Sequence, residues 1–181
     1  SRVERYRRLV SVLRSTIAAA AVFVASVAFA QSPATADAAA KPDRATSDRR
    51  FDNAAQWAKV FDDPKRDQWQ RPDEIVAALS LAPGMTVADL GAGTGYFSKR
   101  LSEAVGADGA VFAVEVEPNL VAHLRDRADD EKTANVVAVL ASVDNPRLPP
   151  ASVDVAIFID AYHHVNGRRD YLIILRRSLR P

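Results

Sequence analysis

Two kinds of segment alternate from about residue 72 to the end of the chain. Short runs that are apolar at most positions are followed by longer segments in which apolar residues recur every three or four positions. The short runs predict buried strands, and the longer segments predict amphipathic helices. We expect strands at 86–90, 110–116, 136–140 and 153–159, and helices at 72–80, 96–105, 118–128 and 168–179.

The predicted strands have no polar face, which is typical of a parallel sheet that is covered on both sides. Because helical segments separate most of them, the sequence predicts an α/β, doubly wound sheet with helices on both faces. A short helical pattern at 54–61 precedes this region, and Pro64 and Pro72 interrupt the segment that follows it. Pro72 itself suits the first position of a helix.

The amino-terminal thirty residues have a different character. Five arginines precede an uncharged apolar run at 16–30, which ends in Ala28, Phe29 and Ala30. This order, with small residues at the −3 and −1 positions, predicts a signal peptide that is cleaved after Ala30. We therefore expect export to the periplasm or the medium. If the segment stays uncleaved it anchors the protein in a membrane, although about 15 apolar residues are fewer than the roughly 20 that span a bilayer.

Residues 31–50 have the composition of a linker. They are rich in Ala, Pro, Ser, Thr and Asp and lack apolar periodicity. Such a segment buries too little apolar surface to order itself, so we expect it to be disordered. One folded domain is then expected at 51–181, in a chain of 181 residues that is 48% hydrophobic.

The composition of the chain excludes several kinds of functional site. The chain has no cysteine, which excludes disulfides, thiolate metal sites and cysteine nucleophiles. Beyond residue 30 it carries 19 basic and 22 acidic residues. That balance gives no electrostatic reason to expect nucleic acid, which would require clustered Lys and Arg. His163 and His164 are adjacent, a poor spacing for chelating one ion, so no metal site is expected.

One turn carries the strongest chemical signal. A predicted strand ends in Asp89 and is followed by Gly91, Gly93 and Gly95, and then by a helical pattern. Turns of this kind bind nucleoside triphosphates, dinucleotides or S-adenosylmethionine. A phosphate-binding loop would need a Gly-Lys-Ser or Gly-Lys-Thr end, which is absent. The dinucleotide fingerprint needs a glycine where this chain has Tyr96, so a nicotinamide-dependent oxidoreductase is a less favoured alternative.

The order Asp-x-Gly-x-Gly-x-Gly resembles motif I of class I S-adenosylmethionine-dependent methyltransferases. Further similarities follow along the chain: Glu115 closes the second strand, Asp144 precedes a Leu-Pro, and the fourth strand ends in Asp160. The resemblance covers about 72–181. It implies a Rossmann-like sheet and S-adenosylmethionine as the cofactor.

The resemblance also implies a set of cofactor-binding residues: Asp89, Gly91, Ala92, Gly93, Gly95, Glu115 and Asp144. In this family the acid at the second strand binds the ribose hydroxyls, and the later Asp lies near the adenine amino group. Asp89 is placed to meet the cationic amino end of the ligand. The backbone N–H groups near the helix start can receive its carboxylate.

Methyl transfer is an in-line displacement, so the protein mainly orients the reactants. A general base is needed only if the acceptor arrives protonated. Asp160, His163 and His164 are the candidates, because they follow the fourth strand, where open α/β sheets place ligands. The sequence thus predicts methyl transfer to a small-molecule acceptor. A module that binds the cofactor without turnover stays open as an alternative.

Two further expectations concern the edges of the site. Trp57, Trp69 and Gln70 lie upstream of the core, and we expect residues 61–72 to form part of a lid. The family sheet has seven strands in the order 3-2-1-4-5-7-6, whereas the pattern here supplies four. The chain is therefore predicted to be a fragment whose fourth strand has an unpaired edge.

Overall fold

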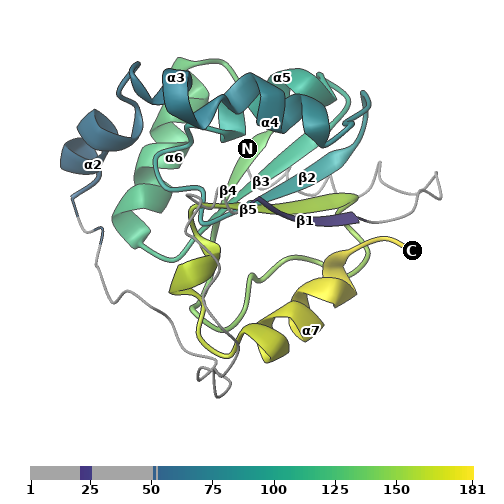
Figure 1. Ribbon diagram of the computed structural model, residues 1–181. Helices are drawn as coiled ribbons and strands as arrows, with labels where there is room; N and C mark the ends of the chain where they lie inside the picture. The colour runs from purple at the N-terminus through teal and green to yellow at the C-terminus, as the bar shows by residue number, and fades with distance from the viewer. Residues whose placement is uncertain (1–20, 26–50, 52) are drawn as a thin grey trace, which may run out of the picture.

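A computed structural model describes residues 21–25, 51 and 53–181. Its sheet has five strands in the order β1-β5-β2-β3-β4, and each neighbouring pair is parallel (Figure 1). The strands are β1 (Ala21–Ala25), β2 (Thr86–Leu90), β3 (Ala110–Glu115), β4 (Val136–Leu140) and β5 (Val155–Ile159). The predicted parallel sheet is confirmed, and β4-β3-β2-β5 reproduces the order 3-2-1-4 that the resemblance implies.

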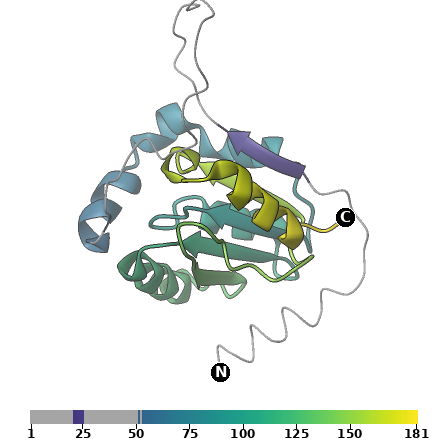
Figure 2. The ribbon, with the colours of Figure 1, turned by 90° about the horizontal axis from the view of Figure 1, so that it is seen from below.

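Helices cover both faces of the sheet, as a doubly wound fold requires. They are α2 (Ala54–Phe61), α3 (Arg66–Gln70), α4 (Pro72–Ala78), α5 (Ser98–Val105), α6 (Pro118–Asp130) and α7 (Arg168–Ser178), with a 3-10 turn η1 (Tyr162–His164). Figures 1 and 2 show α7 on one face and α4, α5 and α6 on the other. The sequence did not predict α3, a single short turn of helix that lies between the two prolines.

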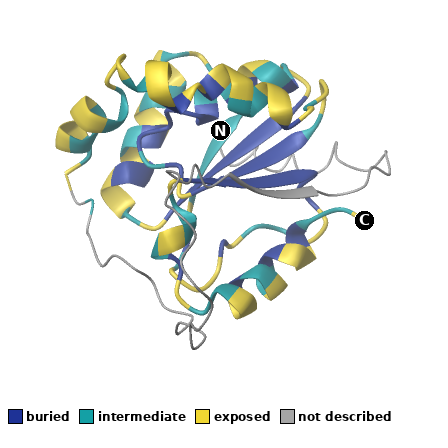
Figure 3. Ribbon diagram, viewed as in Figure 1, coloured by how far each residue is buried: buried dark blue, intermediate teal, exposed yellow. Residues whose placement is uncertain are grey.

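The core explains why the central strands are almost entirely apolar. Every residue of β2, β3 and β5 is buried, and the buried positions run along the middle of the sheet in Figure 3. On one face these strands pack against α4 and α5 through Leu79, Leu101 and Val105. On the other face they pack against Tyr171 and Leu175 of α7. A strand in this position buries side chains on both sides, so a polar face would be destabilising.

The fifth strand comes from a segment for which the sequence predicted another role. Strand β1 lies along β5, with Ala21 beside Val155 and Ala25 beside Ile159. An apolar extended segment satisfies the N–H and C=O groups that β5 would otherwise expose. In the full chain the edge of β5 is therefore paired, and removal of residues 1–30 would expose it. Apart from 21–25, the predicted signal peptide and linker lie outside the described residues and stay predictions.

None of the helices within the described ranges is long and apolar enough to cross a membrane.

A buried ion pair fixes the end of the sheet opposite the glycine loop. Asp154 accepts a hydrogen bond from the backbone N–H of Thr86 at 2.7 Å and pairs with Arg180. Both charged side chains are almost fully buried, at 10% and 12% exposed. Arg180 also donates to the Ser152 carbonyl at 3.1 Å. The start of β2, the start of β5 and the chain after α7 are thus joined at one point.

We predict that Asp154→Ala lowers the free energy of unfolding by about 3 kcal/mol, because it leaves a buried guanidinium and a buried N–H without their partner. Chemical denaturation followed by circular dichroism measures this change. The matched control is Asp73→Ala, which removes a carboxylate that is 91% exposed. The control should change stability by less than about 0.5 kcal/mol. Equal effects of the two substitutions would contradict the account.

Candidate functional site

The glycine loop between β2 and α5 depends on positive φ angles. Gly91, Gly93 and Gly95 have φ of 75°, 58° and 91°. A Cβ on Gly91 would lie 2.4 Å from the Ala161 Cβ, and one on Gly95 would lie 2.9 Å from Leu124 Cδ2. Larger residues here would therefore be strained and would collide with the chain after β5 or with α6. The loop is held close to both of its neighbours.

Glu115 closes β3 and supports this loop. Its side chain is buried, and its Oε2 accepts from the Gly93 N–H at 2.9 Å, while Oε1 accepts from the N–H groups of Val116 and Glu117 at 2.6 and 3.2 Å. Burial raises the pKa of Glu115, and the three N–H donors oppose that rise. A carboxylate has about four acceptor positions, so Glu115 keeps capacity for a ligand hydroxyl.

Asp89 is the second buried acid of the site. It is 3% exposed in β2 and accepts from Ser98 Oγ at 2.7 Å. Burial raises the pKa of Asp89 to about 6; Ser98 and Arg66 oppose the rise, and Glu115 adds to it. The ionised carboxylate is therefore destabilised in this environment. A cationic group bound beside it would relieve that cost.

A cavity of about 830 Å³ opens at the carboxyl ends of β2, β3 and β5. Five of the predicted cofactor residues line it: Asp89, Gly91, Ala92, Gly93 and Glu115. The cavity lies where the strand order reverses between β2 and β5, the place at which open α/β sheets bind ligands. Its volume is within the range of small-molecule sites. The structure thus brings together the loop and the two acids that the sequence singled out.

Two predicted cofactor residues do not line the cavity. Gly95 packs against α6, where a Cβ at this position would lie 2.9 Å from Leu124 Cδ2. Asp144 is exposed, and its carboxylate accepts from Ser142 Oγ at 2.7 Å in a local turn. Its neighbours Ser142 and Val143 reach the cavity instead. The predicted contact of Asp144 with adenine stays a prediction.

The candidate bases after β5 also differ in whether they line the cavity. Asp160 and His164 line the cavity, whereas His163 does not. Asp160 is exposed and has a left-handed φ of 54°, an uncommon conformation that clusters at functional sites. Burial lowers the pKa of His163, as does His164 beside it, while Asp160 opposes the shift. Of the three candidates, Asp160 and His164 are thus the ones that face the cavity.

Helices α2 and α3 with the residues between them (54–70, here called the lid) form one wall of the cavity, beside the glycine loop. Phe61, Arg66 and Trp69 of the lid line the cavity. Trp57 stacks on Phe61 with ring centroids 5.3 Å apart and does not reach the cavity itself. Gln70, the last residue of the lid, is buried. The expectation that this segment lies over the site therefore agrees with the geometry.

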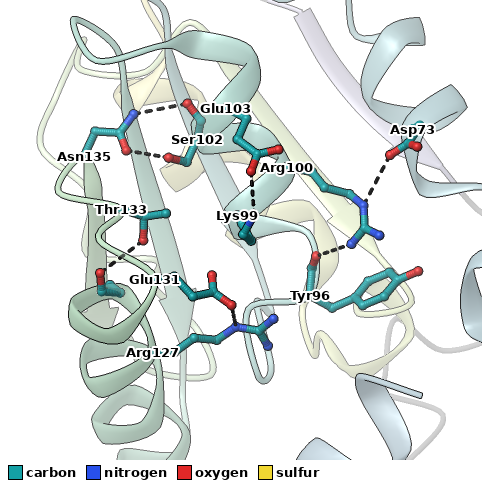
Figure 4. Close-up of polar contacts among 11 residues, drawn as sticks. Asp73, Tyr96, Lys99, Arg100, Ser102, Glu103, Arg127, Glu131, Thr133 and Asn135 are labelled. Atoms are coloured by element: carbon teal, nitrogen blue, oxygen red, sulfur yellow. Dashed lines mark hydrogen bonds and ion pairs between the residues drawn. The ribbon is translucent and has the colours of Figure 1, made fainter. Parts of the chain in front are cut away.

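Asp62 connects the lid to the glycine loop and to α6. It accepts from Thr94 Oγ1 at 3.1 Å and pairs with Arg127 at 2.9 Å. Arg127 also donates to the Thr94 carbonyl at 3.0 Å and pairs with Glu131, a contact drawn in Figure 4. The lid is thus attached directly to the loop that forms the cofactor site.

Asp67 makes the second connection. It accepts from the Tyr96 hydroxyl and pairs with Arg100 at 2.9 Å. Figure 4 shows Arg100 between Asp73 and the backbone of Tyr96. Burial raises the pKa of Tyr96 to about 12, and the hydrogen bond to Asp67 adds to the rise. Tyr96, the residue that departs from the dinucleotide fingerprint, therefore holds the lid.

Arg66 and Tyr171 are two of the cavity-lining residues that sequence reasoning did not single out. Arg66 begins α3 in a segment without a recognisable motif. Tyr171 lies in α7, where its apolar spacing predicts only a core position, and burial raises its pKa. Tyr171 lies in a core stripe that carries no signal for a site. Arg66 lies in the segment 61–72 that the sequence predicts as part of a lid, but nothing in the sequence marks its side chain as one that reaches the cavity.

A parallel sheet with a glycine loop after its central strand, and an acid at the end of the next strand, is the arrangement of class I S-adenosylmethionine-dependent methyltransferases. The family model described as a methyltransferase domain matches residues 87–181, more than half of the chain. The chain belongs to this methyltransferase domain family.

Individual relatives are consistent with that assignment. A crystal structure of a methyltransferase dependent on S-adenosylmethionine from Aquifex aeolicus is 27% identical, with a TM-score of 0.67 over 71% of this chain and 68% of that one. An arsenite methyltransferase of Halobacterium salinarum is 32% identical over 81 residues, 45% of this chain and 21% of the relative. A ubiquinone/menaquinone biosynthesis C-methyltransferase of Ectopseudomonas mendocina is 29% identical over 114 residues, 62% and 44%.

The chain therefore spans less than half the length of these two curated relatives. Other curated relatives are named as methyltransferases of ribosomal RNA or of protein L-isoaspartate. These names cover several kinds of methyl acceptor, so they do not identify the acceptor of this chain.

We predict that Asp89→Asn stabilises the ligand-free protein above pH 6. The folded pKa of about 6 lies above the ordinary value of 3.8, so the wild type loses stability as the pH rises between those values. The neutral amide avoids that loss and can still accept from Ser98. The free energy of unfolding, measured by chemical denaturation, should favour the variant by up to about 3 kcal/mol at pH 8 and by little at pH 4. A difference that is independent of pH would contradict this assignment.

Proposed function

We propose that the chain binds S-adenosylmethionine and transfers its methyl group to a small, largely apolar acceptor. The observation that carries this proposal is the cavity itself, which is lined by the glycine loop, by the buried acids Asp89 and Glu115, and by aromatic side chains of the lid. When bound, the cofactor supplies a methyl group on a sulfonium, which leaves S-adenosylhomocysteine after transfer. Family membership and the Aquifex aeolicus neighbour support this choice of cofactor.

The acidic side of the cavity fits the chemistry of this cofactor. Glu115 would accept a hydrogen bond from a ribose hydroxyl while it holds the Gly93 N–H. Asp89 would face the ammonium group, and the pKa of Asp89, which burial raises to about 6, supports a cation as its ligand partner. Asp160 or His164 would remove a proton from an acceptor that arrives protonated.

The lid side favours an acceptor with an apolar body. Val60 and Trp69 are 57% and 60% exposed, and both line the cavity. Phe51 and Phe61 extend this surface inward, and Phe51 packs edge-on against His164 at 5.7 Å. Exposed apolar side chains at the rim of a pocket mark a ligand surface. The carboxylates of Glu117 and Asp160 in the same lining disfavour a polyanion such as RNA.

We predict that isothermal titration with S-adenosylhomocysteine shows saturable binding to the full chain. Glu115→Gln should weaken this binding about tenfold or more, because a ribose hydroxyl loses a charged acceptor. The control is Glu103→Gln, which changes an exposed acid on α5 that pairs with Lys99. An absence of binding to the wild type, or binding of NADH instead, would contradict the proposal.

Methyl transfer is then tested by release of S-adenosylhomocysteine from S-adenosylmethionine. The acceptor panel comprises quinols, catechols and thiols of low molecular weight, with single-stranded RNA and an isoaspartyl peptide as comparisons. We expect release with an apolar small molecule. Release with RNA or peptide alone would overturn the acceptor class, and binding without release on any acceptor would favour a cofactor-binding module.

A further inference from the structure

Arg66 is a partly buried cation that faces the cavity with most of its hydrogen-bonding capacity unused. Its guanidinium lies over the Tyr96 ring at 4.2 Å, and Nη1 donates to the Phe61 carbonyl at 2.9 Å. Nε is buried without a hydrogen-bond partner. Among the described residues no carboxylate lies within ion-pair distance of it. Since a guanidinium has five N–H donors, an anionic ligand in the cavity would find donors here.

The electrostatic surroundings of Arg66 also favour an anionic ligand. Burial lowers the pKa of Arg66, while Tyr96, Asp160, Asp62 and Asp89 raise it through longer-range attraction. The cation is therefore desolvated but lacks a direct anionic partner. Buried charges in proteins are generally paired, so this guanidinium gains most from a carboxylate that enters the cavity.

The glycine loop offers fewer donors than the sequence suggested. Four of its amides already donate to protein oxygens: Gly91 and Ala92 to the Val114 carbonyl (2.9 and 3.1 Å), Gly93 to Glu115 Oε2 (2.9 Å), and Gly95 to the Ala92 carbonyl (2.9 Å). A ligand carboxylate placed on these amides would have to displace bonds that shape the loop. We expected the amides near the helix start to receive the cofactor's carboxylate. Because these amides already donate to protein oxygens, the carboxylate needs another donor.

We infer that Arg66 binds the α-carboxylate of the cofactor's amino-acid tail and thereby ties the lid to the occupied site. The inference rests on the proposed cofactor. The tail is a zwitterion, and the cavity presents charges of both signs, with Asp89 and Asp160 for the ammonium group and Arg66 for the carboxylate. Because Arg66 is part of the lid and the acids belong to the sheet, the bound tail links the two. Arg66 is a binding residue in this account and takes no part in proton transfer.

The test compares two ligands that differ only in the carboxylate, S-adenosylhomocysteine and S-adenosyl-3-thiopropylamine. Each is titrated calorimetrically into the full chain and into Arg66→Met, which keeps an apolar stem over Tyr96. We expect the substitution to weaken S-adenosylhomocysteine about 10- to 100-fold and to change the carboxylate-free ligand less than about threefold. Arg100→Met is the matched control, because Arg100 also lies over the Tyr96 ring, at 4.7 Å, but pairs with Asp67 and Asp73 outside the cavity. It should affect both ligands alike.

The outcomes separate this inference from the proposed function. If the wild type binds neither ligand, the proposed cofactor is wrong. If it binds both and Arg66→Met weakens them equally, or weakens neither, the role of Arg66 is wrong. Arg66→Lys covers the case in which the Met variant fails to fold, since it keeps the charge but loses the planar fork, and it should lose affinity for S-adenosylhomocysteine alone.

Hydrogen exchange supplies a readout that does not depend on affinity. At saturating concentrations, amides of residues 54–70 should be protected more by S-adenosylhomocysteine than by the carboxylate-free ligand in the wild type. In Arg66→Met the two ligands should protect the lid equally. Equal protection in the wild type would contradict the link between the carboxylate and the lid.

Discussion

The site depends on two buried carboxylates that end neighbouring strands of the sheet. Asp89 and Glu115 lie at the same sheet edge, and each is desolvated enough for its pKa to rise. Ser98 and three backbone N–H groups stabilise the pair, and one of these N–H groups, that of Gly93, belongs to the glycine loop itself. The acids therefore do two things at once. They fix the loop, and they create a need for positive charge that a cationic ligand satisfies.

The lid follows from that arrangement, because its polar contacts reach the loop itself as well as α5 and α6. Asp62 bonds to Thr94 at the centre of the loop, and Asp67 bonds to Tyr96 at its end. Lid and loop thus line one cavity, to which the two acids and aromatic side chains of both segments contribute. Arg66 is the cation that the lid contributes to this cavity, so the site pairs charges of both signs with an apolar mouth.

The fold could be predicted further than the site. Strands β2 to β5 and their helices were predicted within about two residues at nearly every end, since burial on both faces leaves an unmistakable apolar pattern. Segment 21–25 could not be predicted as a strand, because the apolar run at 16–30 is equally typical of a leader. At the site, Asp89 and Glu115 follow from spacing within one motif and the strand after it. Arg66 and Tyr171 reach the same cavity from distant segments, and only tertiary packing brings them there.

We expect a cationic ligand to stabilise the desolvated Asp89 carboxylate. The number of protons released on binding measures this effect. Calorimetric titration of S-adenosylhomocysteine at pH 6, repeated in buffers that differ in ionisation enthalpy, measures that number. With a pKa of about 6, Asp89 is about half protonated in the empty site, and a bound ammonium group should drive the proton off. Net protons should be released on binding at pH 6, and this release should fade by pH 8. Binding without proton release at pH 6, or with proton uptake, would contradict it.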